Sequence, residues 1–279
     1  MQNPCYGQLL CNGSKFSQMI LRRLGNKQAI AQDIIKYFPE HKIYVEPFFG
    51  AGGMFFNKPK AYHNIVNDID SDVFNLFQVV IDQKEELENK FYSMPIHNDL
   101  LKHWMKNKET EPIKKALRFL FLSNFTYLGK QDCLNFSSNA CIKASKDKFS
   151  ILLKQTYSKI YDVGFNNNDF RKFLKDISFP TDGRNNEGKT FIYCDPPYLN
   201  TTDKYEMDDF KKEDSIDLFD ALQATGCKFA MSEFDNEFIL NQAKERGLNV
   251  IIIGERKNLK NRRTEILITN YEKQKSLFD

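Results

Sequence analysis

The chain has 279 residues, 41% of them hydrophobic and 28% charged, which is the composition of a globular protein with a sizeable core. The formal net charge is only +3, so overall charge does not indicate a nucleic-acid-binding protein, and only local basic clusters bear on that question. Six cysteines without a CxxC pair, four histidines, no signal-peptide pattern and no long apolar run argue against structural zinc, secretion and membrane spanning, so we expect a cytoplasmic protein without metal.

The N-terminal part of the chain divides into an arm and a helix. Residues 1–15 are polar and show no periodicity, which predicts a loose arm. From Phe16 onward apolar residues recur at three- and four-residue spacing as far as Phe38, and Pro39 follows. This pattern predicts a helix that ends before the proline.

Short apolar segments bounded by turn formers predict seven strands. Helical stretches such as 215–224 and 238–246 separate most of them, and this alternation is typical of a parallel sheet covered on both faces. Only the basic, irregular segment 254–264 separates the last two strands, so we predict that this pair is antiparallel. The result is an α/β fold with a seven-stranded, mostly parallel, Rossmann-like sheet. The predicted strands are 43–46, 64–67, 159–164, 190–194, 228–232, 249–253 and 265–269.

Residues 83–157 lack this alternation and form an insertion between the second and third strands. The segment is rich in helix patterns, with 114–122 the clearest amphipathic piece, followed by the polar stretch 124–148. We therefore predict one catalytic, cofactor-binding domain made of residues 1–82 and 158–279. The helical insertion 83–157 is predicted to be its target-recognition domain.

A glycine-rich turn follows the first predicted strand, in the sequence Val-Glu-Pro-Phe-Phe-Gly-Ala-Gly-Gly at 45–53. Glycines allow a tight turn and close approach of a ligand to the backbone, although a turn without a ligand remains an alternative. The spacing GxGG differs from GxGxxG, which argues against a nicotinamide dinucleotide. After the second strand, Asp68 can accept hydrogen bonds from both ribose hydroxyls of a nucleoside cofactor. The cofactor-binding residues predicted here are Glu46, Phe49, Gly50, Gly52 and Asp68.

The most specific motif is Cys-Asp-Pro-Pro-Tyr at 194–198, directly after the fourth predicted strand. Two prolines remove two donors, so the Pro196 carbonyl is left to accept a hydrogen bond, and Asp195 adds a second acceptor. Together they can hold an exocyclic amino group, while Tyr198 can stack on a base taken out of its helix. Such a reaction depends on alignment, with the carboxylate offsetting charge on the nitrogen. We predict Asp195, Pro196, Pro197 and Tyr198 to be catalytic; a surface Asp-Pro-Pro turn is the alternative.

These motifs together resemble the Dam-type family of adenine-N6 DNA methyltransferases, in the order that places the recognition insert between the cofactor half and the catalytic half. The resemblance spans about residues 16–273, and it includes Leu-Gly-Asn-Lys at 24–27 and Thr-Glu-Ile-Leu-Ile-Thr-Asn-Tyr at 264–271. It implies a class I fold that binds S-adenosylmethionine. It also implies methyl transfer to N6 of a flipped adenine at a specific site in double-stranded DNA.

The resemblance assigns further residues to the cofactor. It implies that Arg23 and Lys27 contact S-adenosylmethionine, that Asp68 binds its ribose and that Asp195 lies beside its methionine end. It also implies that Asp169 and Phe170 border the adenine of the cofactor.

Three positions depart from the family pattern. The family usually carries Trp or Tyr where this chain has Arg23, and Ser-Asn where it has Ser232 and Glu233. The stretch 126–148 lacks the usual Asn-rich hairpin, so recognition of GATC is not implied.

Local basic clusters are the candidates for DNA contact. The densest lies between the last two predicted strands, where it can neutralise backbone phosphates or be a solvated loop. The polar stretch 200–212 can close over a flipped base. A second basic face is predicted on the insertion at Lys102, Lys106, Lys108, Lys114, Lys115 and Arg118, with Asn124, Tyr127, Lys130 and Gln131 as candidate readers of base edges. The residues predicted to bind DNA are Lys130, Arg256, Lys260, Arg262 and Arg263.

Other functions remain open from the sequence alone. One is a methyltransferase that acts on RNA adenine or cytosine N4, which needs the same alignment of an amino group. Another is a DNA-binding protein with a decayed active site, and the weakest is a nicotinamide-dependent oxidoreductase. We expect a monomer, and a restriction endonuclease that acts on the same DNA site without a stable complex is a candidate partner.

Overall fold

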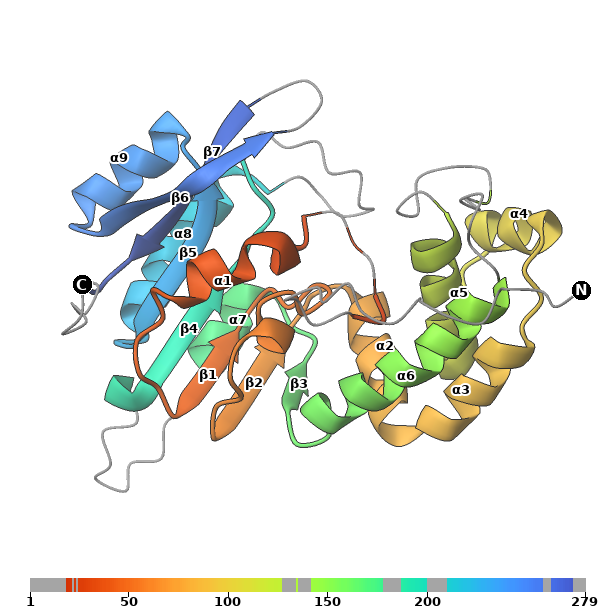
Figure 1. Ribbon diagram of the computed structural model, residues 1–279. Helices are drawn as coiled ribbons and strands as arrows, with labels where there is room; N and C mark the ends of the chain where they lie inside the picture. Colours follow the sequence, from red (N-terminus) through yellow and green to blue (C-terminus); the bar gives the residue numbers. More distant parts are fainter. Residues whose placement is uncertain are drawn as a thin grey trace, which may run out of the picture.

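The computed structural model describes residues 19–21, 23, 25–126, 134, 142–177, 187–199, 210–257 and 262–272 (Figure 1). The predicted arm 1–15, the segment 200–209 and the DNA-binding candidates Lys130 and Lys260 lie outside these residues.

In the described part of the chain, seven strands form one sheet in the order β3-β2-β1-β4-β5-β7-β6. The strands from β3 to β5 pair in parallel, whereas β7 is antiparallel to both β5 and β6. This confirms the predicted sheet and its antiparallel final pair. The strands are β1 (Ile43–Glu46), β2 (His63–Asn67), β3 (Gly164–Asn166), β4 (Thr190–Cys194), β5 (Lys228–Phe234), β6 (Asn249–Lys257) and β7 (Arg262–Thr269).

Helices cover both faces of the sheet (Figure 1). Along β4, Ile192 and Cys194 point to one face and pack in a cluster with α7, α8 and α9. Phe191 and Tyr193 point to the other face, where they share a core with α1 and α2. Because both faces are buried, the central strands are apolar without interruption. The helices are η1 (Lys27–Ile30), α1 (Ala31–Ile35), η2 (Phe55–Asn57), α2 (Ser71–Asp82), α3 (Lys84–Ser93), α4 (Asn98–Lys106), α5 (Pro112–Phe125), α6 (Ile142–Ile160), α7 (Phe170–Asp176), η3 (Glu187–Lys189), α8 (Lys212–Ala224) and α9 (Glu237–Glu245).

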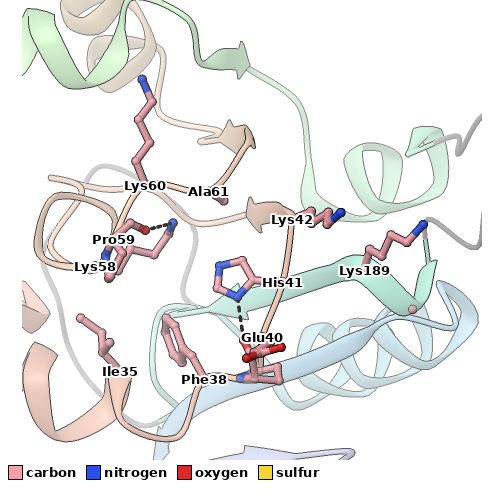
Figure 2. Close-up of a pocket in the computed structure, with 12 residues that line it drawn as sticks. Ile35, Phe38, Glu40, His41, Lys42, Lys58, Pro59, Lys60, Ala61 and Lys189 are labelled. Atoms are coloured by element: carbon pink, nitrogen blue, oxygen red, sulfur yellow. Dashed lines mark hydrogen bonds between the residues drawn. The ribbon is translucent and has the colours of Figure 1, made fainter.

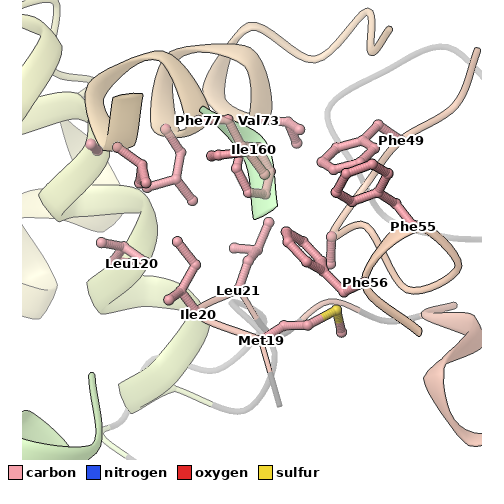
Figure 3. Close-up of a cluster of buried hydrophobic side chains, with 14 of the residues drawn as sticks. Met19, Ile20, Leu21, Phe49, Phe55, Phe56, Val73, Phe77, Leu120 and Ile160 are labelled. Carbon is pink, nitrogen blue, oxygen red and sulfur yellow. The ribbon is translucent and has the colours of Figure 1, made fainter. Parts of the chain in front are cut away.

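The helices α3 to α6 lie beside the β3 edge of the sheet (Figure 1). Their sequence position between β2 and β3 is that of the predicted insertion. One continuous core joins them to the sheet, because Leu120 of α5 and Ile160 of α6 belong to the same buried cluster as Phe77 of α2 and Phe56 near the glycine turn (Figure 3). None of the described helices is long and apolar enough to cross a bilayer.

The predicted third strand, 159–164, was wrong. Lys159 and Ile160 are the last residues of α6, and β3 begins only at Gly164. Ile160 is fully buried and continues the apolar stripe of α6 after Phe149 and Leu153. A short apolar run cannot distinguish the end of a buried helix from a strand, and here the helix is the correct interpretation.

The predicted N-terminal helix was also too long. The segment from Met19 to Leu21 is buried but not helical, and helical structure begins at Lys27. Gly25 has φ of 81°, a conformation that interrupts a right-handed helix. Over the described residues 19–21 the apolar pattern therefore reflects burial of an irregular segment.

Candidate active site

The carboxyl ends of β1, β2 and β4 lie next to one another at one edge of the sheet. The chain order reverses between β1 and β4, and in open α/β sheets ligands bind in the crevice at such a switch point. The glycine turn follows β1 and the 194–198 motif ends β4. The fold therefore brings the two strongest sequence motifs to one place.

The glycine turn is shaped by backbone conformations that favour glycine. Gly50 has φ of 53° and Gly52 has φ of 75°. A Cβ atom on Gly53 would lie 2.1 Å from Oδ1 of Asn26, so the segment before η1 packs directly on the turn. Asn26 caps η1 by accepting a hydrogen bond from the Gln28 amide at 3.0 Å. This packing carries Lys27 into the site.

Asp68, predicted to bind a cofactor ribose, is held against the glycine turn. Its Oδ2 atom accepts a hydrogen bond from the Gly50 amide at 2.6 Å, and its Oδ1 atom accepts one from the Asp70 amide at 2.9 Å. Burial raises the pKa of Asp68, and the nearby Arg23 guanidinium opposes that shift. Arg23 itself forms an ion pair of 2.7 Å with Asp70, so this chain places a cation beside Asp68.

Lys27 connects the cofactor side of the site to the 194–198 motif. Its Nζ atom lies 2.8 Å from Oδ1 of Asp195 and 3.3 Å from Oε1 of Glu265, and only 3% of the residue is exposed. The same ammonium lies 4.3 Å from the centre of the Tyr198 ring. The Tyr198 hydroxyl donates a hydrogen bond to Glu265. Four residues from three segments, namely η1, the 194–198 motif and β7, thus form one largely buried network.

Two further carboxyl groups are buried at this edge. Glu233 accepts hydrogen bonds from the amides of Phe234 at 2.8 Å and Leu199 at 3.4 Å. Glu46 accepts a hydrogen bond of 2.7 Å from the Tyr44 hydroxyl. Burial raises the pKa of both to about 8, and the charge of Asp195 adds to each shift. Both groups are therefore mostly protonated at neutral pH.

Sequence reasoning missed the role of Glu265. It was noted only as part of the ending 264–271 and was given no function. The available signal was a glutamate inside an apolar strand, because buried glutamates are rare unless they are paired. Its partners come from η1 and from the end of β4, which no local pattern connects to β7.

The structure limits the predicted cofactor contact of Phe49 to its backbone. Its ring is buried in the core, with the centre 5.0 Å from that of Phe77 and 5.4 Å from that of Phe165. Its backbone amide donates a hydrogen bond to the Asn67 carbonyl. The side chain therefore supports the turn from behind, and only the Phe49 backbone remains a candidate for cofactor contact.

Asp169 and Phe170 lie at the start of α7. Asp169 caps this helix by accepting a hydrogen bond of 2.8 Å from the Arg171 amide. The Phe170 ring centre lies 5.4 Å from that of Phe48 in the glycine turn and 6.0 Å from that of Phe210. This aromatic cluster flanks the turn, and its contact with a cofactor remains a prediction.

The basic segment near 254–264 is more regular than predicted, since β6 continues to Lys257 and β7 begins at Arg262. Arg256 and Arg262 are thus in strands. Arg263 lies with its guanidinium 5.3 Å from the centre of the Phe234 ring, next to the active site.

Parts of the predicted basic face on the insertion have structural roles. Lys115 lies 3.3 Å from Asp72 of α2, and Arg118 donates hydrogen bonds to the carbonyls of Trp104 and Asn107. The Asn124 amide donates to the carbonyls of Ile20 and Leu120. These contacts hold the helices together, and they engage the side-chain nitrogen of Asn124 that would otherwise donate to a base edge.

A hollow of about 700 Å³ lies away from this site (Figure 2). Its lining residues directly precede β1, β2 and β4, among them Lys42, Lys60 and Lys189, so it opens at the amino ends of the strands. The described residues contain no group of three His, Cys, Asp or Glu side chains that could hold a metal ion.

Comparison with known proteins identifies the family of this chain. The model of the family described as D12 class N6 adenine-specific DNA methyltransferase matches residues 24–264. A DNA adenine methylase of Vibrio cholerae serotype O1 is 26% identical over 259 residues, which cover 85% of this chain and 81% of the relative. The modification methylase StsI of Streptococcus sanguinis is 25% identical over 309 residues, covering 98% of this chain and 46% of that protein. A putative methyltransferase from Streptococcus mutans, solved in complex with SAH, has a TM-score of 0.40 and 10% identity, covering 88% of this chain and 97% of that one.

Proposed function

Because the chain belongs to the D12 class of N6 adenine-specific DNA methyltransferases, an S-adenosylmethionine-dependent family with the class I fold predicted above, we propose that Asp195, Pro196, Pro197 and Tyr198 carry out its methyl transfer. The observation that supports this assignment most is the network of Lys27, Asp195, Glu265 and Tyr198 at the switch point of the sheet. A surface Asp-Pro-Pro turn would not need such partners.

The residues around the glycine turn fit S-adenosylmethionine. Positive φ angles at Gly50 and Gly52 open the backbone of the turn, and Asp68 is held beside it by the Gly50 amide. We assign the ribose to Asp68 and the methionine end to the region of Lys27 and Asp195. Arg23, Glu46, the Phe49 backbone, Asp169 and Phe170 complete the proposed cofactor site. When bound, the cofactor supplies an electrophilic methyl group on a sulfonium.

The chain's own residues align the amino group that accepts this methyl. In our proposal the Asp195 carboxylate and the Pro196 carbonyl accept the two hydrogens of adenine N6, which directs the nitrogen lone pair toward the methyl donor. The nitrogen gains a bond to the methyl carbon, whose bond to sulfur breaks, and N6 loses one proton to water. Lys27 fixes one carboxylate oxygen of Asp195 at 2.8 Å, so the acceptor has a set orientation before the base arrives.

Adenine N6 cannot reach such a site from within a duplex, so the target base must leave the helix. We assign to Tyr198 the stacking of this flipped base. Only 7% of Tyr198 is exposed, so a base can reach the face of its ring only after a covering group moves. Closure and opening of the site thus become part of the binding step.

We extend this proposal to the DNA substrate, the oligomeric state and the partner of the enzyme. We propose a specific site in double-stranded DNA, contacted by the predicted residues Lys130, Arg256, Lys260, Arg262 and Arg263. We propose that the protein acts as a monomer in the compartment that holds the DNA. A restriction endonuclease that recognises the same site, without a stable complex, is the proposed partner.

The test is methyl transfer from radiolabelled S-adenosylmethionine to unmethylated double-stranded DNA, with RNA in parallel. We expect label in DNA as N6-methyladenine and at least about a thousandfold loss of rate in Asp195→Ala, because an aligning group and an electrostatic partner are removed together. Label in RNA or on cytosine N4 would contradict the proposed substrate. Cofactor binding without transfer to any nucleic acid would indicate a decayed homologue, and calorimetry with the wild-type chain measures that binding.

A further inference from the structure

Glu265 occupies a rigid place in the sheet. It lies on β7, which is paired on both sides, and its register partner on β5 is Phe234. The residue is almost completely buried. A carboxylate is costly to bury unless other groups compensate, so its position invites a functional explanation.

The contacts of Glu265 reach both ends of the 194–198 motif. Its Oε1 atom accepts the hydrogen bond from the Tyr198 hydroxyl and lies 3.3 Å from Nζ of Lys27. Lys27 in turn lies 2.8 Å from Asp195. One oxygen atom therefore acts directly on the tyrosine and, through one ammonium, on the aspartate.

We propose that Glu265 is a positioning residue for methyl transfer, which holds the Tyr198 ring by its hydroxyl and holds Lys27 against Asp195. This inference rests on the proposed function of the 194–198 motif. It adds a residue from a different strand whose action is exerted only through Tyr198 and Lys27.

The packing around Tyr198 agrees with such a role. The Phe234 ring meets the Tyr198 ring edge-on, with centres 4.7 Å apart and an angle of 85° between the planes. Lys27 lies over the same ring at 4.3 Å. The packing thus limits the tilt of the Tyr198 ring. The hydrogen bond to Glu265 holds the hydroxyl end of the side chain in one position. Both matter because a reaction that depends on alignment is sensitive to shifts of about 1 Å.

The experiment is a double-mutant cycle on the full chain with Glu265→Gln, Tyr198→Phe and the double variant. Glu265→Gln keeps the shape and one oxygen acceptor but removes the charge that faces Lys27. Single-turnover transfer is measured at saturating DNA and cofactor, and calorimetry counts intact cofactor sites in each variant. Glu237→Gln, at an exposed glutamate on α9, is the control for loss of one charge.

We expect the transfer rate to fall about ten- to hundredfold in Glu265→Gln, as for loss of a charge-assisted contact, with cofactor affinity and the KM for DNA changed less than about threefold. We expect the double variant to lose clearly less than the product of the two single losses, because both changes act on one hydrogen bond.

Additive losses, or a Glu265→Gln rate equal to that of Glu237→Gln, would overturn the inference. A parallel loss of rate and of countable cofactor sites would also overturn it, since it would indicate damage to the fold. The same cycle measured by urea unfolding reports the Glu265–Tyr198 coupling independently of activity. A wild-type chain that methylates no DNA, with this coupling intact, would instead contradict the proposed function.

Discussion

Two buried lysines at opposite edges of the sheet have different surroundings. Lys27, at the carboxyl edge, has two carboxylates within 3.3 Å. Lys58, at the amino edge, lines the hollow of Figure 2 and donates hydrogen bonds to two neutral acceptors, the Pro59 carbonyl at 2.9 Å and Oδ1 of Asn64 at 3.3 Å. It also lies over the Tyr44 ring at 3.9 Å.

The two lysines differ in how far their neighbours compensate the cost of burying a charge. Burial lowers the pKa of Lys58 to about 8, and the nearby charge of Glu46 only partly opposes that shift. Neutral partners thus leave the cost of desolvation largely uncompensated. At the carboxyl edge the cation is paired, and removal of one partner would leave buried charges without compensation. The active-site edge is therefore the one where single substitutions should be most costly.

The largest effect is expected from Lys27→Met. This change leaves Asp195 and Glu265 facing each other without their shared cation, and breaking a buried pair costs about 3–5 kcal/mol. We expect the lower half of that range, because 21% of the Asp195 side chain is exposed and solvent screens it. Urea unfolding at pH 7 measures the loss.

Lys58→Met is the matched comparison at the amino edge. It removes an ammonium that only neutral acceptors hold, so we expect a loss of at most about 1–2 kcal/mol at pH 7. Equal losses of unfolding free energy in Lys27→Met and Lys58→Met would contradict the comparison, because they would show that carboxylate partners make no difference to the contribution of a buried lysine.

The sequence predicted the parts of the fold that depend on local patterns. The predicted segments 43–46 and 190–194 coincide with β1 and β4, because buried central strands are apolar runs bounded by turn formers. The glycine turn and Asp68, each predicted from its position after a strand, lie together because the carboxyl ends of parallel strands meet at one edge.

What the sequence did not predict depends on contacts between distant segments. Glu265 meets Lys27 and Tyr198 only because β7 inserts between β5 and β6, an order that no local pattern specifies. Phe49 was assigned to the cofactor as part of a motif, yet its ring packs in the core. A motif specifies which backbone approaches a ligand, whereas the direction of each side chain is decided by packing.

The pH dependence of stability should sharpen the comparison, because the free energy of unfolding should change with opposite sign for Glu233 at the carboxyl edge and Lys58 at the amino edge. Burial raises the pKa of Glu233 from 4.5 to about 8, so the folded state binds more protons between these values. The free energy of unfolding contributed by this group is fully present below pH 4.5 and is lost as the pH rises to 8, with a slope of at most about 1.4 kcal/mol per pH unit. Because the pKa of Glu46 is also raised to about 8, Glu233→Gln should lower this slope by the share of Glu233 and leave the share of Glu46, in urea unfolding measured from pH 5 to 8.

For Lys58 the change of stability with pH has the opposite sign. Its pKa is lowered from 10.5 to about 8, so the unfolded chain binds more protons in that range and stability should rise from pH 8 toward 10.5. Lys58→Met should abolish this rise and leave the contribution of Glu233 to the acidic slope unchanged. An acidic slope of undiminished size in Glu233→Gln would contradict the contribution assigned to Glu233 and leave the slope to Glu46 or another carboxyl group.

The smallest effect is expected at Arg263, a partly exposed cation that stacks on Phe234 beside the site. If it contacts a backbone phosphate, Arg263→Ala should weaken DNA binding severalfold and lower the slope of log affinity against log salt concentration by about 1. Equilibrium binding from 50 to 200 mM salt measures this, with Lys244→Ala on the exposed face of α9 as control. An unchanged salt slope combined with slower methyl transfer would mean that Arg263 acts on Tyr198 through Phe234 and belongs to the buried network of the carboxyl edge. A reduced slope with normal transfer from bound DNA would place it among exposed cations, whose energies are small because water and salt screen them.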